Sequence, residues 1–257
     1  MKSRLRRVIV LAATGVALLA GACGGIDTPD PRPPVFAAAP WEGPERLLYE
    51  LKQRDYVYGR CTLETVPEVE PGVTQLNRLC QGVEDEQFRD DATVLVDSRT
   101  LAPLSAQRIN TNMETGERVT RTADYPREGG VIAFQVVQDN GKTNRATREM
   151  PEPTEAVPIA AVYEDEALFW LVRGLPLADG YEAEYTTAST MTVRVFNVEV
   201  AVEGREQVTV PAGTFEAWNV RIKTSAATNR LWVEVAPPRR IVKANIEFLT
   251  YELVETE

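Results

Sequence analysis

The amino-acid sequence predicts a mainly β fold: a curved antiparallel sheet or half-open barrel, with one helix across its concave face. From residue 191 onward, short stretches of alternating apolar and polar residues follow one another, with turn signals between them. Consecutive strands joined by short turns form an antiparallel meander. One segment, residues 165–175, instead places apolar residues at helical spacing.

The first elements expected are a helix over residues 44–52 and then strands. Pro44 suits the first turn of a helix, Glu45 suits its positive end, and the leucines at 47, 48 and 51 share one helical face. Strands are expected over residues 92–96 and 131–137. A hairpin tip is expected around residues 114–116, and Asn140-Gly141 predicts a second hairpin turn.

The clearest strands lie in the C-terminal third. Valines alternate with polar residues up to Val195 and again, one position out of phase, from Val198, so a bulge is expected at Phe196–Asn197. The residues Pro211-Ala212-Gly213 predict a turn. Further strands are expected over residues 215–222, 231–235 and 241–252.

The helix expected over residues 165–175 is apolar on all sides. Asp165 can cap it and Pro176 ends it. One face carries Leu168, Leu171, Val172 and Leu175. Phe169 and Trp170 lie on other sides, so we expect this helix to be covered on both sides or to lie in a cavity.

The N-terminus indicates an exported protein. Residues 1–22 read as a signal peptide, because a basic start precedes an apolar run, Val8 to Ala20, that is shorter than the roughly 20 residues needed to span a bilayer. The run ends in small residues and Cys23, which resembles the lipobox of bacterial lipoproteins, whose cysteine receives diacylglycerol. The alternative is an ordinary secretory peptide with an incidental cysteine.

The mature chain is expected to have two parts. Residues 23–43 are rich in proline and predict an extended tether that lifts the domain off the membrane; a loop wrapped on the domain surface is the alternative. Residues 44–257 are expected to form an antiparallel β domain with an N-terminal helix.

Charge and composition exclude several functions. The chain has 28 Lys and Arg against 38 Asp and Glu, a net charge of −10, which argues against a nucleic-acid partner. It has no histidine, the commonest general base and metal ligand. We therefore expect no metal site, no cofactor and no catalytic residue.

Cys61 and Cys80 are expected to form a structural disulfide, because an exported chain meets an oxidising compartment. Closing this segment would contribute roughly 3 kcal/mol on the chain-entropy model. A redox pair or two metal ligands are the alternatives, but the spacing and the lack of further ligands nearby do not favour them.

Two acidic runs are the only paired carboxylates of note. They are Glu84-Asp85-Glu86 and Glu164-Asp165-Glu166. Such runs are usually solvated faces, and the second also suits a helix N-terminus. A carboxylate-dependent hydrolase is the least favoured hypothesis, because no motif supports it.

Several stretches in order resemble the bacterial exported family called domain of unknown function 3108. They are Leu171 to Leu177, Val208 to Phe215, and Trp232 with Arg239 to Lys243, with a weaker match at Asp97 to Pro103. The residues Val233-Glu234 after Trp232 depart from the usual pattern. The resemblance implies an envelope protein with a curved antiparallel sheet, similar to the half-barrel of lipoprotein carriers, and implies no catalytic residues.

The function expected is that of a membrane-anchored, non-enzymatic protein that binds an apolar, lipid-like ligand in the concavity of the sheet. The domain would lie in the periplasm or the extracellular space, held to the membrane through Cys23. A scaffolding lipoprotein, with a filled core and protein partners, is the alternative. Candidate lining residues are Phe169, Trp170, Val195, Phe196, Phe215, Trp218 and Trp232.

Overall fold

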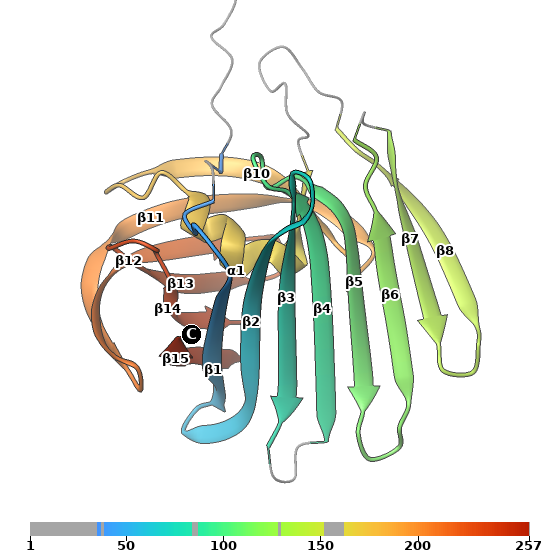
Figure 1. The fold of residues 1–257 in the computed structure, drawn as a ribbon, viewed down its shortest axis with the longest axis horizontal. Coiled ribbons are helices and arrows are strands. Elements are labelled where there is room, and N and C mark those ends of the chain that lie inside the picture. The colour runs from blue at the N-terminus through green and yellow to red at the C-terminus, as the bar shows by residue number, and fades with distance from the viewer. Residues whose placement is uncertain (1–34, 37–38, 84–86, 128–129, 152–161, 257) are drawn as a thin grey trace, which may run out of the picture. The chain divides into compact units, whose positions relative to one another are not determined.

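The structure is a computed structural model that describes residues 35–36, 39–83, 87–127, 130–151 and 162–256. Within these residues, fifteen strands form one sheet in the order β8-β7-β6-β5-β4-β3-β2-β1-β15-β14-β13-β12-β11-β10-β9. All neighbours are antiparallel except β9 and β10, which are parallel. The sheet is curved around a short helix, and its two edges, β8 and β9, are not paired with each other (Figure 1). The predicted fold class is confirmed.

The first eight strands form consecutive hairpins. They are β1 (Glu45–Gln53), β2 (Tyr56–Glu70), β3 (Val73–Gly82), β4 (Phe88–Asp97), β5 (Pro103–Asn112), β6 (Arg118–Asp124), β7 (Val131–Gln138) and β8 (Thr143–Glu149). Of the remaining strands, β9 precedes the helix and the others follow it. They are β9 (Val162–Glu164), β10 (Glu182–Ser189), β11 (Arg194–Val210), β12 (Gly213–Lys223), β13 (Thr228–Glu234), β14 (Ile241–Ile246) and β15 (Leu249–Thr256).

The helix expected over residues 44–52 is wrong, because this segment is strand β1. Its buried residues, Leu47, Tyr49 and Leu51, recur at every second position, and β1 is hydrogen-bonded to β2 on one side and β15 on the other. Pairing along both edges satisfies the backbone and outweighs a weak helical pattern.

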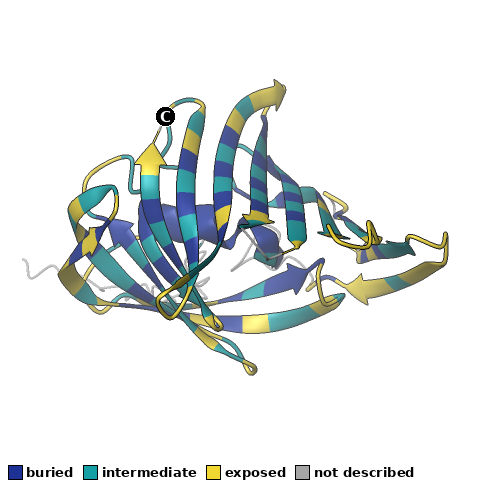
Figure 2. Ribbon diagram, turned by 90° about the horizontal axis from the view of Figure 1, so that it is seen from below, coloured by how far each residue is buried: buried dark blue, intermediate teal, exposed yellow. Residues whose placement is uncertain are grey.

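One face of the sheet forms the core, and we call it the inner face. Leu51 lies opposite Tyr251, and Tyr251 lies opposite Ala244, so that their side chains point to the same side. All three are buried. Figure 2 shows the same alternation as dark bands along the strands.

The strands predicted for the C-terminal third are present, with two differences. The stretch 241–252 is divided into β14 and β15 by a turn at Glu247 and Phe248. The bulge lies between Val202 and Gly204, while β10 and β11 pair in unbroken register past Phe196. Gly204 has a φ of 126°, which explains why the irregularity is placed there.

The predicted helix is confirmed as a short helical segment on the inner face. It comprises a 3₁₀ turn (Asp165–Ala167), α1 (Leu168–Leu171) and a second 3₁₀ turn (Val172–Gly174). Every residue of α1 is buried. The ring of Phe169 packs against those of Tyr49 and Tyr251, which ties α1 to the sheet.

The end of the Pro-rich segment packs on the domain, contrary to an extended tether up to residue 43. Phe36 is 1% exposed, and its ring makes edge-on contacts with Tyr163 and Tyr185. Arg173 lies over the ring of Trp41. Aromatic side chains dispersed among the prolines thus find partners on the domain, and any free tether ends before Phe36. The predicted signal peptide and Cys23 lie outside the described residues.

Within the described ranges, no helix combines the length and the apolarity that crossing a bilayer requires.

Candidate functional site

A cavity of about 360 Å³ opens beside the first half of the helical segment. Its walls differ in polarity. Strands β1, β14 and β15 and helix α1 contribute apolar residues, namely Leu51, Ile246, Leu249, Tyr251, Leu168 and Phe169. Strands β3 to β5 and the first 3₁₀ turn contribute charged ones, namely Arg78, Asp90, Arg108, Asp165 and Glu166.

Two exposed apolar side chains also line the cavity. Phe248, in the β14–β15 turn, is 63% exposed, and Met191, in the β10–β11 turn, is 38% exposed. Single exposed apolar residues are common on proteins, but these two line the same cavity and add to its apolar surface.

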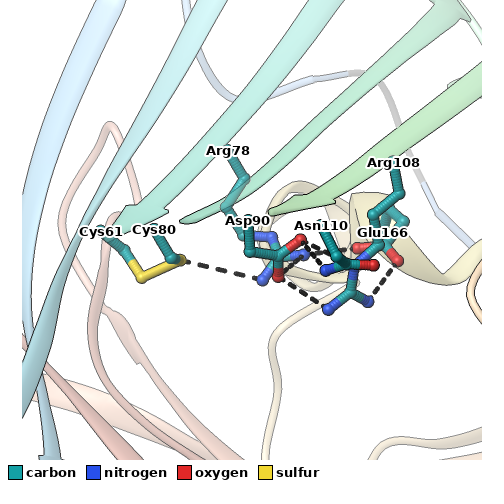
Figure 3. The surroundings of a disulfide bond; sticks show 7 residues. All are labelled: Cys61, Arg78, Cys80, Asp90, Arg108, Asn110 and Glu166. Carbon is teal, nitrogen blue, oxygen red and sulfur yellow. Dashed lines mark hydrogen bonds and ion pairs between the residues drawn. A yellow bond between two sulfur atoms is a disulfide. The ribbon is translucent and has the colours of Figure 1, made fainter. Parts of the chain in front are cut away.

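The charged wall is a network of ion pairs between the sheet and the helical segment (Figure 3). Arg108 binds Asp90 through two hydrogen bonds of 2.8 and 2.7 Å, and it donates to Glu166 at 2.7 Å. Arg78 donates to the other oxygen of Glu166, also at 2.7 Å. Buried charges persist when they are paired in this way.

The register of the sheet explains the network. Arg78 lies between Leu76 and Cys80 at every second position of β3, so its side chain is on the inner face. Asp90 lies opposite both Cys80 and Asn110. Burial opposes the charge of Arg78, but Glu166 and Asp90 outweigh that effect and raise its pKa above the ordinary value.

Asp165 and Glu247 are the remaining acids on the cavity wall. Burial, with a contribution from the charge of Glu166, raises the pKa of Asp165 to about 6, although Arg108 and Arg78 oppose the shift. A hydrogen bond from Ser189 also favours its ionised form.

Glu164 belongs to a separate, closed cluster. It is 1% exposed and accepts hydrogen bonds from the Tyr125 hydroxyl and from the backbone and hydroxyl of Thr190. Burial, followed by the charge of Glu166, raises the pKa of Glu164 to about 8. The run 164–166 was predicted to be a solvated face, and this is wrong for Glu164 and Glu166, which are buried. The run 84–86 lies outside the described residues.

Arg173, at the other end of the helical segment, is held by contacts within the domain. It is 1% exposed, donates to both carboxylate oxygens of Glu45 at 2.6 and 3.1 Å, and donates to the Pro238 carbonyl at 3.0 Å. These contacts fasten the end of the helix to β1 and to the β13–β14 loop.

The predicted disulfide between Cys61 and Cys80 is present, with an S–S distance of 2.00 Å. It joins facing positions of β2 and β3 on the inner face, and Cys80 lines the cavity. Figure 3 shows it next to the ion-pair network.

Of the seven predicted lining residues, the structure places Phe169 on the cavity wall. Trp170 is buried and donates from its indole nitrogen to the Thr65 hydroxyl at 2.9 Å. The other five lie half-buried on β11 to β13 and are not among the residues that line the cavity. They are Val195, Phe196, Phe215, Trp218 and Trp232.

Cationic side chains lie over three of the four aromatic members of this second group. Arg205 lies over Trp218, Arg240 over Phe215 and Lys243 over Trp232. The ligand role proposed for these residues stays a prediction.

Sequence reasoning missed the charged wall. The sequence does contain a signal for it. Arg78, Asp90 and Arg108 each lie two positions from an apolar residue of the same strand, so they share its apolar face. A charge in phase with the apolar face of a strand indicates a buried pair or a site. Among the described side chains, no group of three or more Cys, Asp or Glu residues is arranged to hold a metal ion.

One of two comparisons with solved structures agrees with the fold. The crystal structure of a "beta-barrel-like protein of domain of unknown function DUF1849" from Brucella abortus is similar, with a TM-score of 0.52 and 14% identity over 84% of this chain and 97% of that chain. A protein from Bacteroides fragilis with a YmcC-like fold, inferred to be exported, aligns with a TM-score of 0.25 and 10% identity over 87% and 99% of the two chains. No curated protein matches the sequence.

The family comparison confirms the resemblance that the sequence motifs indicate. Residues 81–250 match the family described as "Protein of unknown function (DUF3108)". That match runs from the end of β3 to the start of β15 and includes the helical segment, whereas β1 and β2 precede it. The chain therefore belongs to the DUF3108 family.

Proposed function

We propose that this protein is an exported, membrane-anchored lipoprotein that binds an apolar, lipid-like molecule and is not an enzyme. The observation that carries the proposal is the cavity of about 360 Å³ between α1 and the inner face. Ligand pockets in proteins occupy about 300–1,000 Å³ and are lined mainly by apolar side chains with a few polar groups. The wall around Phe169 is apolar, and the charged wall opposite makes this cavity more polar than most such pockets.

The exposed side chains at the cavity support the same proposal. Phe248 and Met191 contact water in the unliganded protein, and an apolar ligand would cover them. Removing such surface from water contributes about 25 cal/mol per Å² to binding. Phe248 and Met191 therefore favour binding of a molecule with an apolar part in the cavity.

The proposal is tested with the uncharged fluorescent probe N-phenyl-1-naphthylamine and the mature domain. We expect saturable binding by the wild type and about tenfold weaker binding by Phe248→Ser, because the variant loses apolar contact area without disturbing the core. Met113→Ser, which replaces an exposed apolar side chain outside the cavity, is the matched control and should bind normally. Absence of saturable binding by the wild type would contradict the proposal and favour the scaffolding alternative.

A hydrolase is the second candidate, since Asp165 lines the cavity and has a raised pKa. Acid–base catalysis by a carboxylate pair would need a second carboxylate held beside Asp165. Glu247 also lines the cavity, but it is an exposed residue of the β14–β15 turn. Glu164 is closed off by Tyr125 and Thr190, and Glu166 is fully paired with two arginines. The binding proposal expects no turnover of p-nitrophenyl esters, whereas turnover that Asp165→Asn abolishes would support the hydrolase.

A further inference from the structure

We infer that the ligand of this cavity is a single-chain amphiphile with an anionic head, a carboxylate or a phosphate, and that the head binds at a row of arginines formed by Arg78, Arg108 and Arg121. The inference rests on the proposed function, because it specifies the chemistry of the molecule bound at the same cavity.

The row follows from the register of strands β3 to β6. Arg78 lies opposite Ala92, Ala92 lies opposite Arg108, and Arg108 lies opposite Arg121. Directly opposed residues of antiparallel strands have Cβ atoms about 5 Å apart and point to the same face. Arg78 and Arg108 line the cavity, and Arg121 is the next side chain on the inner face.

The row carries one cation that no described carboxylate pairs with. Asp90 and Glu166 are fully engaged by Arg78 and Arg108. Arg121 instead donates to a neutral group, the Asn110 amide oxygen, at 2.7 Å. Burial, followed by repulsion from Arg108, lowers the pKa of Arg121, although the charges of Asp90 and Glu166 oppose the shift.

The polar and apolar side chains of the cavity are unevenly distributed along the sheet. The arginines extend over β3, β5 and β6, whereas most apolar side chains come from β1, β14 and β15, beyond β2. The stacked rings of Tyr58 on β2 and Phe88 on β4 also line the cavity. A molecule with its head at Arg121 would therefore have its chain directed toward Leu51, Leu249 and Tyr251. A head that accepts two hydrogen bonds matches the planar fork of a guanidinium.

Asp165 opposes an anion in the cavity, because it lies on the wall and is partly ionised near neutral pH. It lies within electrostatic range of Arg78 and Arg108 but is not among the groups that affect Arg121. This arrangement favours placement of the head at the Arg121 end of the row.

The inference is tested by displacing N-phenyl-1-naphthylamine with four ligands that share a twelve-carbon chain: laurate, dodecyl phosphate, dodecanol and dodecyltrimethylammonium. For the wild type we expect at least one of the two anions to bind about tenfold or more tightly than dodecanol, since a charged hydrogen bond replaces a neutral one. Arg121→Gln, which can keep the contact with Asn110, should remove that preference by weakening the two anions far more than dodecanol. Asp165→Asn should increase the preference for the anions over dodecanol.

The control is Arg118→Gln, an exposed arginine on the opposite face of the same strand β6, which should behave as the wild type. Which of the two anions binds more tightly identifies the head group. If dodecanol or dodecyltrimethylammonium binds as tightly as both anions, or if Arg121→Gln keeps the preference, the inference is overturned while the proposed function stands. If no twelve-carbon ligand displaces the probe, or the probe does not bind, the proposed function fails first.

Discussion

At the scale of single residues, the molecule is defined by charged side chains placed inside a β core. Arg78, Asp90 and Glu166 are buried, and each is paired with an opposite charge. Pairing offsets much of the cost of removing a charge from water, and loss of one partner leaves the other uncompensated. The same rule applies to Arg173 and Glu45, far from the cavity.

Arg173→Met is expected to destabilise the domain strongly. The variant keeps an apolar stem but leaves the carboxylate of Glu45, whose side chain is 12% exposed, without its partner. Breaking a buried pair in this way costs about 3–5 kcal/mol. Denaturant unfolding of the purified domain measures the loss.

The matched control for Arg173 is Arg46→Met. Arg46 contacts Glu64 at the surface, where both side chains are more than 40% exposed. Such pairs contribute about 0–1 kcal/mol, so little change is expected. Equal losses in the two variants would contradict the role given to Arg173.

Glu164 should make stability depend on pH. Its pKa is raised from 4.5 to about 8 by burial, so the folded protein holds this proton more tightly than the unfolded chain does. The stabilisation from the neutral form is complete below about pH 4.5 and is lost as the pH rises through about 8.

Glu164→Gln tests this prediction, because the amide cannot ionise. Relative to the variant, the wild type should lose up to about 1.4 kcal/mol of unfolding free energy per pH unit between these limits. Asp165→Asn is the comparison. The pH-dependent part of the difference in unfolding free energy between this variant and the wild type should lie at lower pH and end near pH 6. If the difference in unfolding free energy between the wild type and Glu164→Gln stays constant from pH 5 to 9, the raised pKa assigned to Glu164 is ruled out.

At the scale of elements, the alternation of apolar and polar residues predicted the strands that have one apolar and one polar face. It failed where the apolar residues fit both the helical and the strand spacing. Leu47, Leu48 and Leu51 match a helix, whereas Leu47, Tyr49 and Leu51 match a strand, and only the partners β2 and β15 decide between them. The edge strand β8 carries almost no buried residue and gives no pattern at all. The ion-pair network required the register of β3 to β5, which a single sequence does not supply.

Trp170→Ala tests how α1 is held. The side chain is 2% exposed and hydrogen-bonded to Thr65, so truncation should lower the unfolding free energy by about 3–5 kcal/mol. Trp170→Phe should cost much less, because the ring volume is largely kept. A mild effect of the alanine variant would show instead that Trp170 is poorly packed and free to contact a ligand.

The disulfide is expected to stabilise the β2–β3 hairpin beneath the cavity. Replacing both Cys61 and Cys80 with alanine should lower the unfolding free energy by about 3 kcal/mol on the chain-entropy model. The intact mass of the native protein should rise by two hydrogens on reduction. Labelling of both thiols in freshly isolated protein without reductant would contradict the pairing.

At the scale of the whole molecule, the domain is expected to lie close to a membrane surface. Phe36 is fixed in the core against Tyr163 and Tyr185, so the span between Cys23 and the domain is short. Thirteen residues reach at most about 45 Å when fully extended. An acylated Cys23 would therefore hold the cavity within reach of the membrane, where a lipid-like ligand is abundant.

Cys23→Ser should release the full-length protein from the membrane fraction. A diacylglyceryl group supplies two acyl chains, which anchor a protein stably, whereas the serine variant would have none. The variant lacking Cys61 and Cys80 is the cysteine-matched control and should stay with the membrane, because its anchor is intact. Metabolic labelling with a fatty acid should mark the wild type and this control but not Cys23→Ser. Retention of an unlabelled Cys23→Ser protein after an alkaline carbonate wash would show that something other than acylation holds the protein to the membrane.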